Sequence, residues 1–312
     1  MKRLLVVALA IGALFPTTAR SQPPTVVAIW GAQSAGPIGT IGHPNGITIG
    51  PSGHAFVADG VNARIVEISP DGSFVAEYGA PGTDTLRGPS KVAFGSDRTM
   101  YVSDGAACGI SMWSNSIYQG WFGGCGGGPG QLQSASWGVA VNGDRVYVSD
   151  TQGYRVEVFN TAGQFLFAWS TNDLSEGLAV DASGNVYVAQ YAGRVGVYSP
   201  TGSLISTIGT PGSGPGQLNS PYDVALDGAG NVYVADSYNH RIEVFTSGGA
   251  YVTAWGTRGS DPGQFIQPRG VTVGPDGRIY VADTWNDRIQ VFGSLPTPTK
   301  PSTWGALKAK YR

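Results

Sequence analysis

Residues 221–245 read PYDVALDGAGNVYVADSYNHRIEVF, and residues 268–292 repeat the pattern as PRGVTVGPDGRIYVADTWNDRIQVF. Weaker copies begin near Pro44, Pro89, Ser136 and Ser175. The residues that close the VYVAD-like segment lie 40 to 47 positions apart, at Asp59, Asp104, Asp150, Gln190, Asp236 and Asp283. A period of this size, with several short strands in each unit, is typical of a β-propeller or another repeat array.

Each unit predicts four antiparallel strands and no helix. In the fifth copy the alternating, β-forming segments are residues 222–226, 232–236, 241–245 and 251–255. Between the first two segments, Asp227 and Asn231 flank Gly and Ala, a composition that favours a tight turn. Four strands joined by tight turns make one propeller blade, so we predict an all-β, six-bladed β-propeller.

The two ends of the chain predict how the ring closes. The sixth copy stops after its third strand at Phe292, whereas residues 25–30, TVVAIW, match the fourth strand YVTAW but have no earlier strands before them. Pairing this N-terminal strand with the incomplete last blade removes two open sheet edges. We therefore expect the sixth blade to be assembled from both ends of the chain.

The unit resembles the NHL repeat. The resemblance rests on GPGQL (residues 214–218), Pro221, GNVYVAD (230–236) and NHRIEVF (239–245), with GQF (263–265) and NDRIQVF repeating them. It extends over nearly all of residues 25–293 and implies an NHL-type propeller. The second copy departs from it with Cys108-Gly109 in place of the Arg, and the fourth has Gln190 in place of the Asp and lacks the Pro-Gly-Gln loop.

The N-terminus predicts export. Met1-Lys-Arg is followed by an apolar run to Phe15 and then by small residues, so residues 1–21 are interpreted as a cleaved signal peptide. The propeller then occupies residues 22–293, and residues 294–312 form a Pro/Thr linker with a basic and aromatic tail. We expect a secreted, periplasmic or extracellular protein with no membrane span. The tail is interpreted as a frayed or surface-docked end, with a partner-binding peptide as the alternative.

The charge balance argues against a nucleic acid partner. The chain has 19 basic and 21 acidic residues, and removal of residues 1–21 leaves 16 basic residues, a formal charge of −5. Some NHL-type propellers bind RNA, which requires an electropositive surface. We therefore predict no nucleic acid binding, and a monomer whose partner is a protein, peptide or glycan.

The two cysteines predict one disulfide. In a propeller, the loop between the second and third strands lies on the same face as the loop that links successive blades. Cys108 falls in the first kind of loop and Cys125 in the second, so the two thiols should be neighbours in an oxidising compartment. A reactive thiol or a metal-binding pair is the alternative.

Positions that differ between copies, within a frame that is otherwise repeated, are candidates for function. The Asp and Arg five residues apart recur in four copies and are interpreted as a structural brace. The position before the first strand instead varies around the ring, as Asn45, Ser90, Trp137, Glu176, Tyr222 and Arg269. The predicted ligand-binding residues on this face are Trp137, Glu176, Tyr191, Tyr222, Asp223, Tyr238, Arg269 and Trp285. Lys91 and Asp223, in opposite blades, should place opposite charges across the channel mouth.

Among enzymes, a calcium-assisted hydrolase of the lactonase or esterase type is the alternative function. Asn45, Glu176 and Asp223 offer the oxygen ligands that Ca²⁺ prefers, so calcium is the candidate cofactor. Propellers that resemble this one also include a lyase with a His-ligated zinc. This chain has only three histidines, and they lie at different positions of the repeats and not together on one face. No nucleophile elbow is evident. The sequence favours a non-catalytic binding or scaffold propeller, whose ligand lies on the face with the inter-blade loops.

Overall fold

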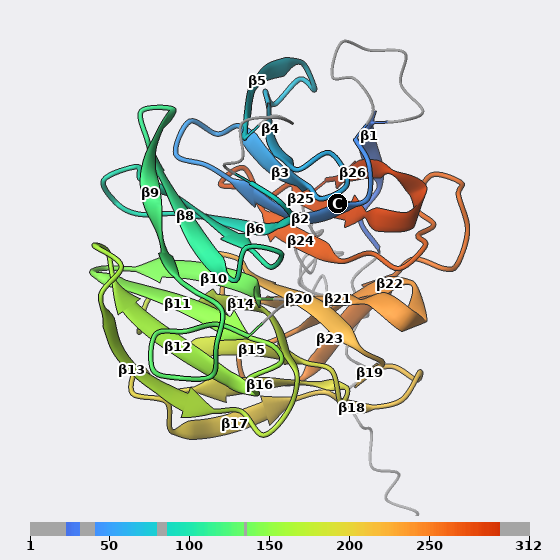
Figure 1. Cartoon of the computed structure of the whole chain (residues 1–312). Helices are drawn as coiled ribbons and strands as arrows, with labels where there is room; N and C mark the ends of the chain where they lie inside the picture. Colours follow the sequence, from blue (N-terminus) through green and yellow to red (C-terminus); the bar gives the residue numbers. More distant parts are fainter. Residues whose placement is uncertain (1–22, 32–40, 80–85, 134–135, 294–312) are drawn as a thin grey trace, which may run out of the picture.

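The computed structural model describes residues 23–31, 41–79, 86–133 and 136–293 (Figure 1). In these ranges six four-stranded antiparallel sheets surround a central axis, which confirms the predicted all-β, six-bladed propeller. The two helical elements of this part are short 3-10 turns, η1 (Ser237–Asn239) and η2 (Thr284–Asn286). The predicted signal peptide and C-terminal tail lie outside the described residues.

The strands follow the repeats from the centre of the ring outward. Blade 1 contains β2 (Pro44–Ile49), β3 (Ala55–Asp59), β4 (Arg64–Ile68) and β5 (Phe74–Tyr78). Blade 2 contains β6 (Pro89–Phe94), β7 (Met100–Asp104), β8 (Gly109–Ser114) and β9 (Ile117–Gly123). Blade 3 contains β10 (Ser136–Asn142), β11 (Arg145–Asp150), β12 (Arg155–Asn160) and β13 (Phe165–Ser170).

The second half of the ring has the same plan. Blade 4 contains β14 (Ser175–Val180), β15 (Val186–Gln190), β16 (Arg194–Tyr198) and β17 (Leu204–Ile208). Before blade 5, β18 (Thr210–Pro211) and β19 (Gln217–Leu218) form a small parallel pair. Blade 5 contains β20 (Pro221–Leu226), β21 (Val232–Asp236), β22 (Arg241–Phe245) and β23 (Tyr251–Trp255). Blade 6 contains β24 (Gly270–Val273), β25 (Ile279–Asp283), β26 (Arg288–Phe292) and β1 (Val26–Gly31).

The N-terminal strand closes the ring, as its sequence predicted. β1 pairs antiparallel with β26, with Trp30 opposite Ile289, and the blue β1 lies beside the red β26 in Figure 1. Trp30 is buried, with its ring centroid 5.6 Å from that of Tyr280. The first strand of each blade contacts that of the next, and β24 returns to β2. Closure therefore buries an aromatic side chain as well as a sheet edge.

Burial explains why the second strand of each blade is the most apolar. The second strands of blades 1, 2, 4, 5 and 6 are buried along their whole length, because another blade covers each of their faces. Residues such as Val57 and Val234 are completely inaccessible to solvent. Strands buried on both faces need apolar side chains on both, which gives near-continuous apolar runs.

An ion pair braces most blades on the face with the inter-blade loops. In blade 5 the Arg241 Nε lies 2.8 Å from the Asp236 Oδ2, and its two Nη groups donate to the carbonyl oxygens of Ser213, Gly214 and Gln217. The guanidinium thus connects its own blade to the preceding loop. The same Asp–Arg bond occurs at Asp59/Arg64, Asp150/Arg155 and Asp283/Arg288.

The predicted disulfide is confirmed between Cys108 and Cys125, whose Cα atoms are 5.0 Å apart. It ties the loop between the second and third strands of blade 2 to the loop that leads into blade 3. Within the described ranges, no helix has the length and apolar composition to cross a bilayer.

Candidate functional site

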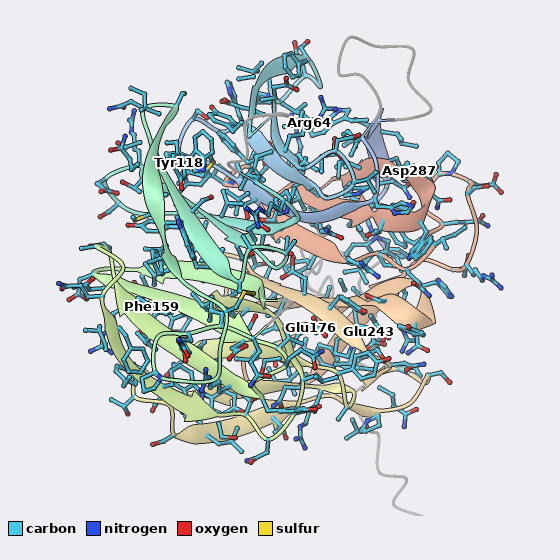
Figure 2. All side chains as sticks on the ribbon, in the orientation of Figure 1. Arg64, Tyr118, Phe159, Glu176, Glu243 and Asp287 are labelled. Carbon is cyan, nitrogen blue, oxygen red and sulfur yellow. A yellow bond between two sulfur atoms is a disulfide. The ribbon has the colours of Figure 1, made fainter. Side chains whose placement is uncertain are left out.

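The predicted site residues gather where the first strands begin, around the central axis. Asn45 is in β2, Glu176 is in β14, Tyr222 and Asp223 are in β20, and Arg269 immediately precedes β24. Figure 2 shows Glu176 toward the middle of the ring. These strands all start on the face with the inter-blade loops, so residues distant in the sequence meet there.

Arg269 and Tyr222 stack at the centre of this face. The guanidinium carbon of Arg269 lies 4.8 Å from the centroid of the Tyr222 ring, within the range of a cation–π contact. An Nη of Arg269 also lies 3.4 Å from the Asn45 Oδ1. Asn45 in turn donates from Nδ2 to the carbonyl of Pro89, at 3.2 Å. Blades 1, 5 and 6 therefore contribute to one polar cluster.

Glu176 is a buried acid of the cluster whose pKa is strongly raised. Its side chain is almost completely buried, and its Oε2 has no hydrogen-bond partner among the described residues. Burial raises the pKa of Glu176 to about 8, although the charge of Arg269 opposes the shift. Near pH 7 the carboxyl group is thus mostly protonated and can donate a hydrogen bond. Burial also raises the pKa of Tyr222.

Lys91 and Asp223 form a buried ion pair across the axis. The Lys91 Nζ donates to the Asp223 Oδ2, which also accepts from the Val271 N–H at 3.0 Å. Asp223 is completely buried, and burial raises its pKa while the Lys91 ammonium opposes the shift. The opposite charges expected at the channel mouth therefore neutralise each other directly, and Lys91 is an addition to the residues predicted for the site.

This ion pair lies between two spaces on the axis. On the side of the inter-blade loops, Asn45, Tyr222 and Arg269 line a very small pocket, together with Lys91 and Asp223. Lys91 also lines a larger cavity of about 290 Å³, which is walled by the first strands of all six blades. A ligand that approaches from the loop face would meet the cluster before the cavity.

Three exposed aromatic side chains stand on the same face. Tyr191, Tyr238 and Trp285 are 37%, 44% and 49% exposed, and all follow the second strand of their blades. The rings of Tyr191 and Tyr238 lie 6.4 Å apart in an edge-on arrangement. The ring centroids of Trp285 and His43 lie 4.9 Å apart. The 3-10 turns η1 and η2 place Tyr238 and Trp285 outward.

The structure describes the side chains of all the predicted ligand-binding residues except Trp137. Trp137 is in β10, but its side chain lies outside the described residues. His240 accepts a hydrogen bond at Nδ1 from the Gln267 N–H, at 3.1 Å. This bond connects blade 5 to the loop that enters blade 6.

The candidate calcium ligands stay a prediction. Asn45 and Asp223 line the same small pocket, and Asp223 already shares its Oδ2 with Lys91. In the described part of the chain, no group of three or more His, Cys, Asp or Glu side chains is placed to hold a metal ion. A cation bound by Asp223 would have to compete with the Lys91 ammonium.

The family model of the NHL repeat matches residues 218–245 and 265–292. Together with the six blades, this match makes the chain an NHL-repeat β-propeller. A search of curated proteins gives no match.

Several solved structures share the fold. A streptogramin B lyase has a TM-score of 0.60 at 14% identity, with 80% of this chain and 93% of that chain covered. The virginiamycin B lyase of Staphylococcus aureus has a TM-score of 0.59 at 14% identity, with 81% and 95% covered. An auxiliary nutrient binding protein of Bacteroides thetaiotaomicron has a TM-score of 0.62 at 15% identity, with 81% and 69% covered. At these identities the similarity concerns the fold alone.

Proposed function

We propose that the protein is an exported, non-catalytic binding or scaffold propeller that recognises a protein, peptide or glycan on the face with the inter-blade loops. The observation that supports it most directly is the exposed aromatic rim of Tyr191, Tyr238 and Trp285, contributed by blades 4, 5 and 6, on the same face as a buried polar cluster. Aromatic walls with a few convergent polar groups are typical of ligand sites. The disulfide supports an oxidising compartment, where such modules act.

The polar cluster favours a ligand that presents hydrogen-bond acceptors. Near pH 7 the guanidinium of Arg269 and the protonated carboxyl of Glu176 both offer donors. Because the charges of Lys91 and Asp223 balance each other, the cluster then has a net positive charge. Carboxylate groups of peptides and acidic sugars fit such a centre, and their apolar parts would contact the aromatic rim.

Binding to panels of immobilised peptides and oligosaccharides, followed by calorimetry on the hits, would test this function. Arg269→Ala and Tyr238→Ala should each weaken a true ligand by about tenfold or more, as expected for anchor residues. Phe74→Ala is the control, since Phe74 is a similarly exposed aromatic residue at the start of β5, the outermost strand of blade 1. Hits whose affinity is unchanged in both site variants would place the binding surface elsewhere.

A calcium-assisted hydrolase is the second candidate, favoured by the strongly perturbed Glu176. Acids with raised pKa values are common at catalytic sites. Calorimetric titration with Ca²⁺ of the wild-type protein and of Asn45→Ala would test the proposed ligands Asn45, Glu176 and Asp223. Binding of about one Ca²⁺ per chain, weakened by Asn45→Ala, would support this activity. Absence of Ca²⁺ binding would instead favour the non-catalytic binding propeller.

A further inference from the structure

Blade 2 has a glycine where the other blades have an arginine. The last residue of the second strand pairs with the first residue of the third strand, and in blades 1, 3, 5 and 6 this pair is an Asp and an Arg. Blade 4 pairs Gln190 with Arg194. In blade 2 the pair is Asp104 with Gly109. The acid of the brace is therefore present, and its cation is absent.

A cavity of about 190 Å³ lies at this position. It is lined by Arg87, Asp104, Ala107, Gly109, Ser111, Tyr118 and Trp121. Ligand sites for drug-sized molecules are typically ~300–1,000 Å³, so this cavity suits a single side chain rather than a large ligand. It is distinct from the central cluster, because Tyr118 and Trp121 are on β9, the outermost strand of blade 2, and Figure 2 shows Tyr118 far from Glu176.

Asp104 is a buried acid that accepts hydrogen bonds from three neutral backbone N–H groups. Its Oδ2 accepts from the Arg87 N–H at 2.6 Å, and its Oδ1 accepts from the N–H groups of Gly88 and Ala107 at 3.0 and 3.1 Å. A carboxylate offers about four acceptor positions, so about one remains. No ion pair of Asp104 occurs within the described residues, whereas Asp59, Asp150, Asp236 and Asp283 each have an arginine.

A tryptophan replaces the alanine that lies beside the arginine in blades 3 and 5. Ala168 and Ala254 occupy the fourth-strand position opposite Glu157 and Glu243 in blades 3 and 5. The corresponding residue of blade 2 is Trp121, opposite Ser111, and Trp121 is 55% exposed. A Cβ added at Gly109 would lie 2.6 Å from the Trp121 ring. The cavity thus combines an acid with aromatic rings, the two groups that bind a guanidinium.

We propose that this cavity binds the guanidinium group of an arginine side chain presented by a peptide or protein partner. The incoming group would take the place that the chain's own arginine has in the other blades, with its N–H groups on the Asp104 carboxylate and its plane against Trp121 or Tyr118. The geometry of the repeats sets the ligand class, because the same strand pairing holds an arginine in five other blades.

Arg87 lies at the edge of the cavity and modulates this site. Its backbone N–H donates a hydrogen bond to Asp104, while its side chain is exposed. Within the described residues, this side chain forms no ion pair. A second cation at the edge repels an incoming guanidinium. We therefore expect Arg87→Ala to strengthen binding, by about two- to fivefold at low ionic strength.

The test is an NMR titration of the full protein with N-acetyl-L-arginine amide, followed through the tryptophan indole N–H signals. The citrulline amide, which has the same shape without the charge, is the ligand control. Asp104→Asn should weaken binding of the arginine amide by about tenfold or more, and Trp121→Ala by about three- to tenfold. Asp97→Asn is the matched protein control, because it removes one charge from an exposed turn of the same blade.

A second variant tests the origin of the cavity by filling it. Gly109→Arg together with Trp121→Ala restores the arginine and the small fourth-strand residue of blades 3 and 5, although Ser111 stands where those blades have a glutamate. The tryptophan change removes the closest clash with the new side chain. Compared with Trp121→Ala alone, this double variant should bind the arginine amide more weakly and should unfold at a higher temperature. Both results are expected if the new arginine reaches Asp104 through the space that the cavity and the Trp121 ring now occupy.

Three results would overturn the proposal. Equal shifts with the citrulline amide would show that charge is not recognised. Unchanged binding in both Asp104→Asn and Trp121→Ala would place the arginine elsewhere, and retained binding in the double variant would do the same. None of these depends on Arg269 or the aromatic rim, so the outcome is independent of the function proposed for the loop face.

Discussion

Burial of the Glu176 carboxyl group should make the free energy of unfolding decrease as the pH rises. Replacing Glu176 with Gln should remove this part of the pH dependence. Burial raises the pKa of Glu176 from 4.5 to about 8. The folded state therefore holds a proton that the unfolded state releases above about pH 4.5. Stability from this proton is fully present below that pH and is lost as the pH rises through about 8.

The magnitude follows from the size of the shift. One pKa unit corresponds to 1.36 kcal/mol, so the whole effect is ~5 kcal/mol, of which roughly 3 kcal/mol falls between about pH 5.5 and 8.5. Glu157 and Glu243, whose pKa values burial raises to about 7, change stability in the same direction in both proteins. The difference between wild type and Glu176→Gln therefore isolates Glu176.

The assay is urea denaturation at several pH values across this range, followed by tryptophan fluorescence. The advantage of Glu176→Gln over wild type in free energy of unfolding should grow by roughly 3 kcal/mol from the lowest pH to the highest. Asp144→Asn, the corresponding change at an exposed carboxylate that forms no ion pair among the described residues, is the control for the loss of one acidic group. Parallel profiles for Glu176→Gln and wild type would refute the argument, because a solvated carboxylate would then be present.

Two further predictions concern stability at pH 7. Lys91→Met should lower the free energy of unfolding by ~3–5 kcal/mol, because it leaves the Asp223 carboxylate buried without its cation. Adding Asp223→Asn to Lys91→Met should recover ~1 kcal/mol or more of the free energy of unfolding, measured by urea denaturation. If the effects of the two substitutions on this free energy simply add, the two side chains do not interact directly. Replacing Cys108 and Cys125 with Ala opens a loop with a separation of 17 residues and should cost ~3 kcal/mol in the same assay. A loss below ~1 kcal/mol would mean that other contacts already hold this loop.

Much of the architecture was predictable because it depends on local pattern. The alternation in VYVAD and RIEVF, the Asp-Gly turns and the period of 40 to 47 residues are local properties that a strand or a turn must satisfy. The unmatched strand at the N-terminus and the missing strand of blade 6 predicted closure, because an unpaired edge has a physical cost. The disulfide followed from loop placement in the same fold.

The candidate site was only partly predictable. The sequence placed Glu176, Tyr222 and Arg269 at equivalent positions of different blades, but the stacking of Arg269 on Tyr222 depends on side-chain directions across the axis. Likewise, Lys91 and Asp223 were expected on opposite sides of the channel, whereas the distance between those sides decides that they form an ion pair.

Sequence by itself therefore determined the fold, its closure and its disulfide, because each follows from periodicity and from the need to pair strand edges. Tertiary structure decided which side chains meet at the axis and what the substitution at Gly109 leaves behind. The sequence showed that blade 2 lacks an arginine, but only the packing of Trp121 and Tyr118 shows that a cavity beside Asp104 remains. Whether the space beside Asp104 is filled or open depends on how the neighbouring side chains pack in three dimensions, and the repeat pattern does not encode this packing.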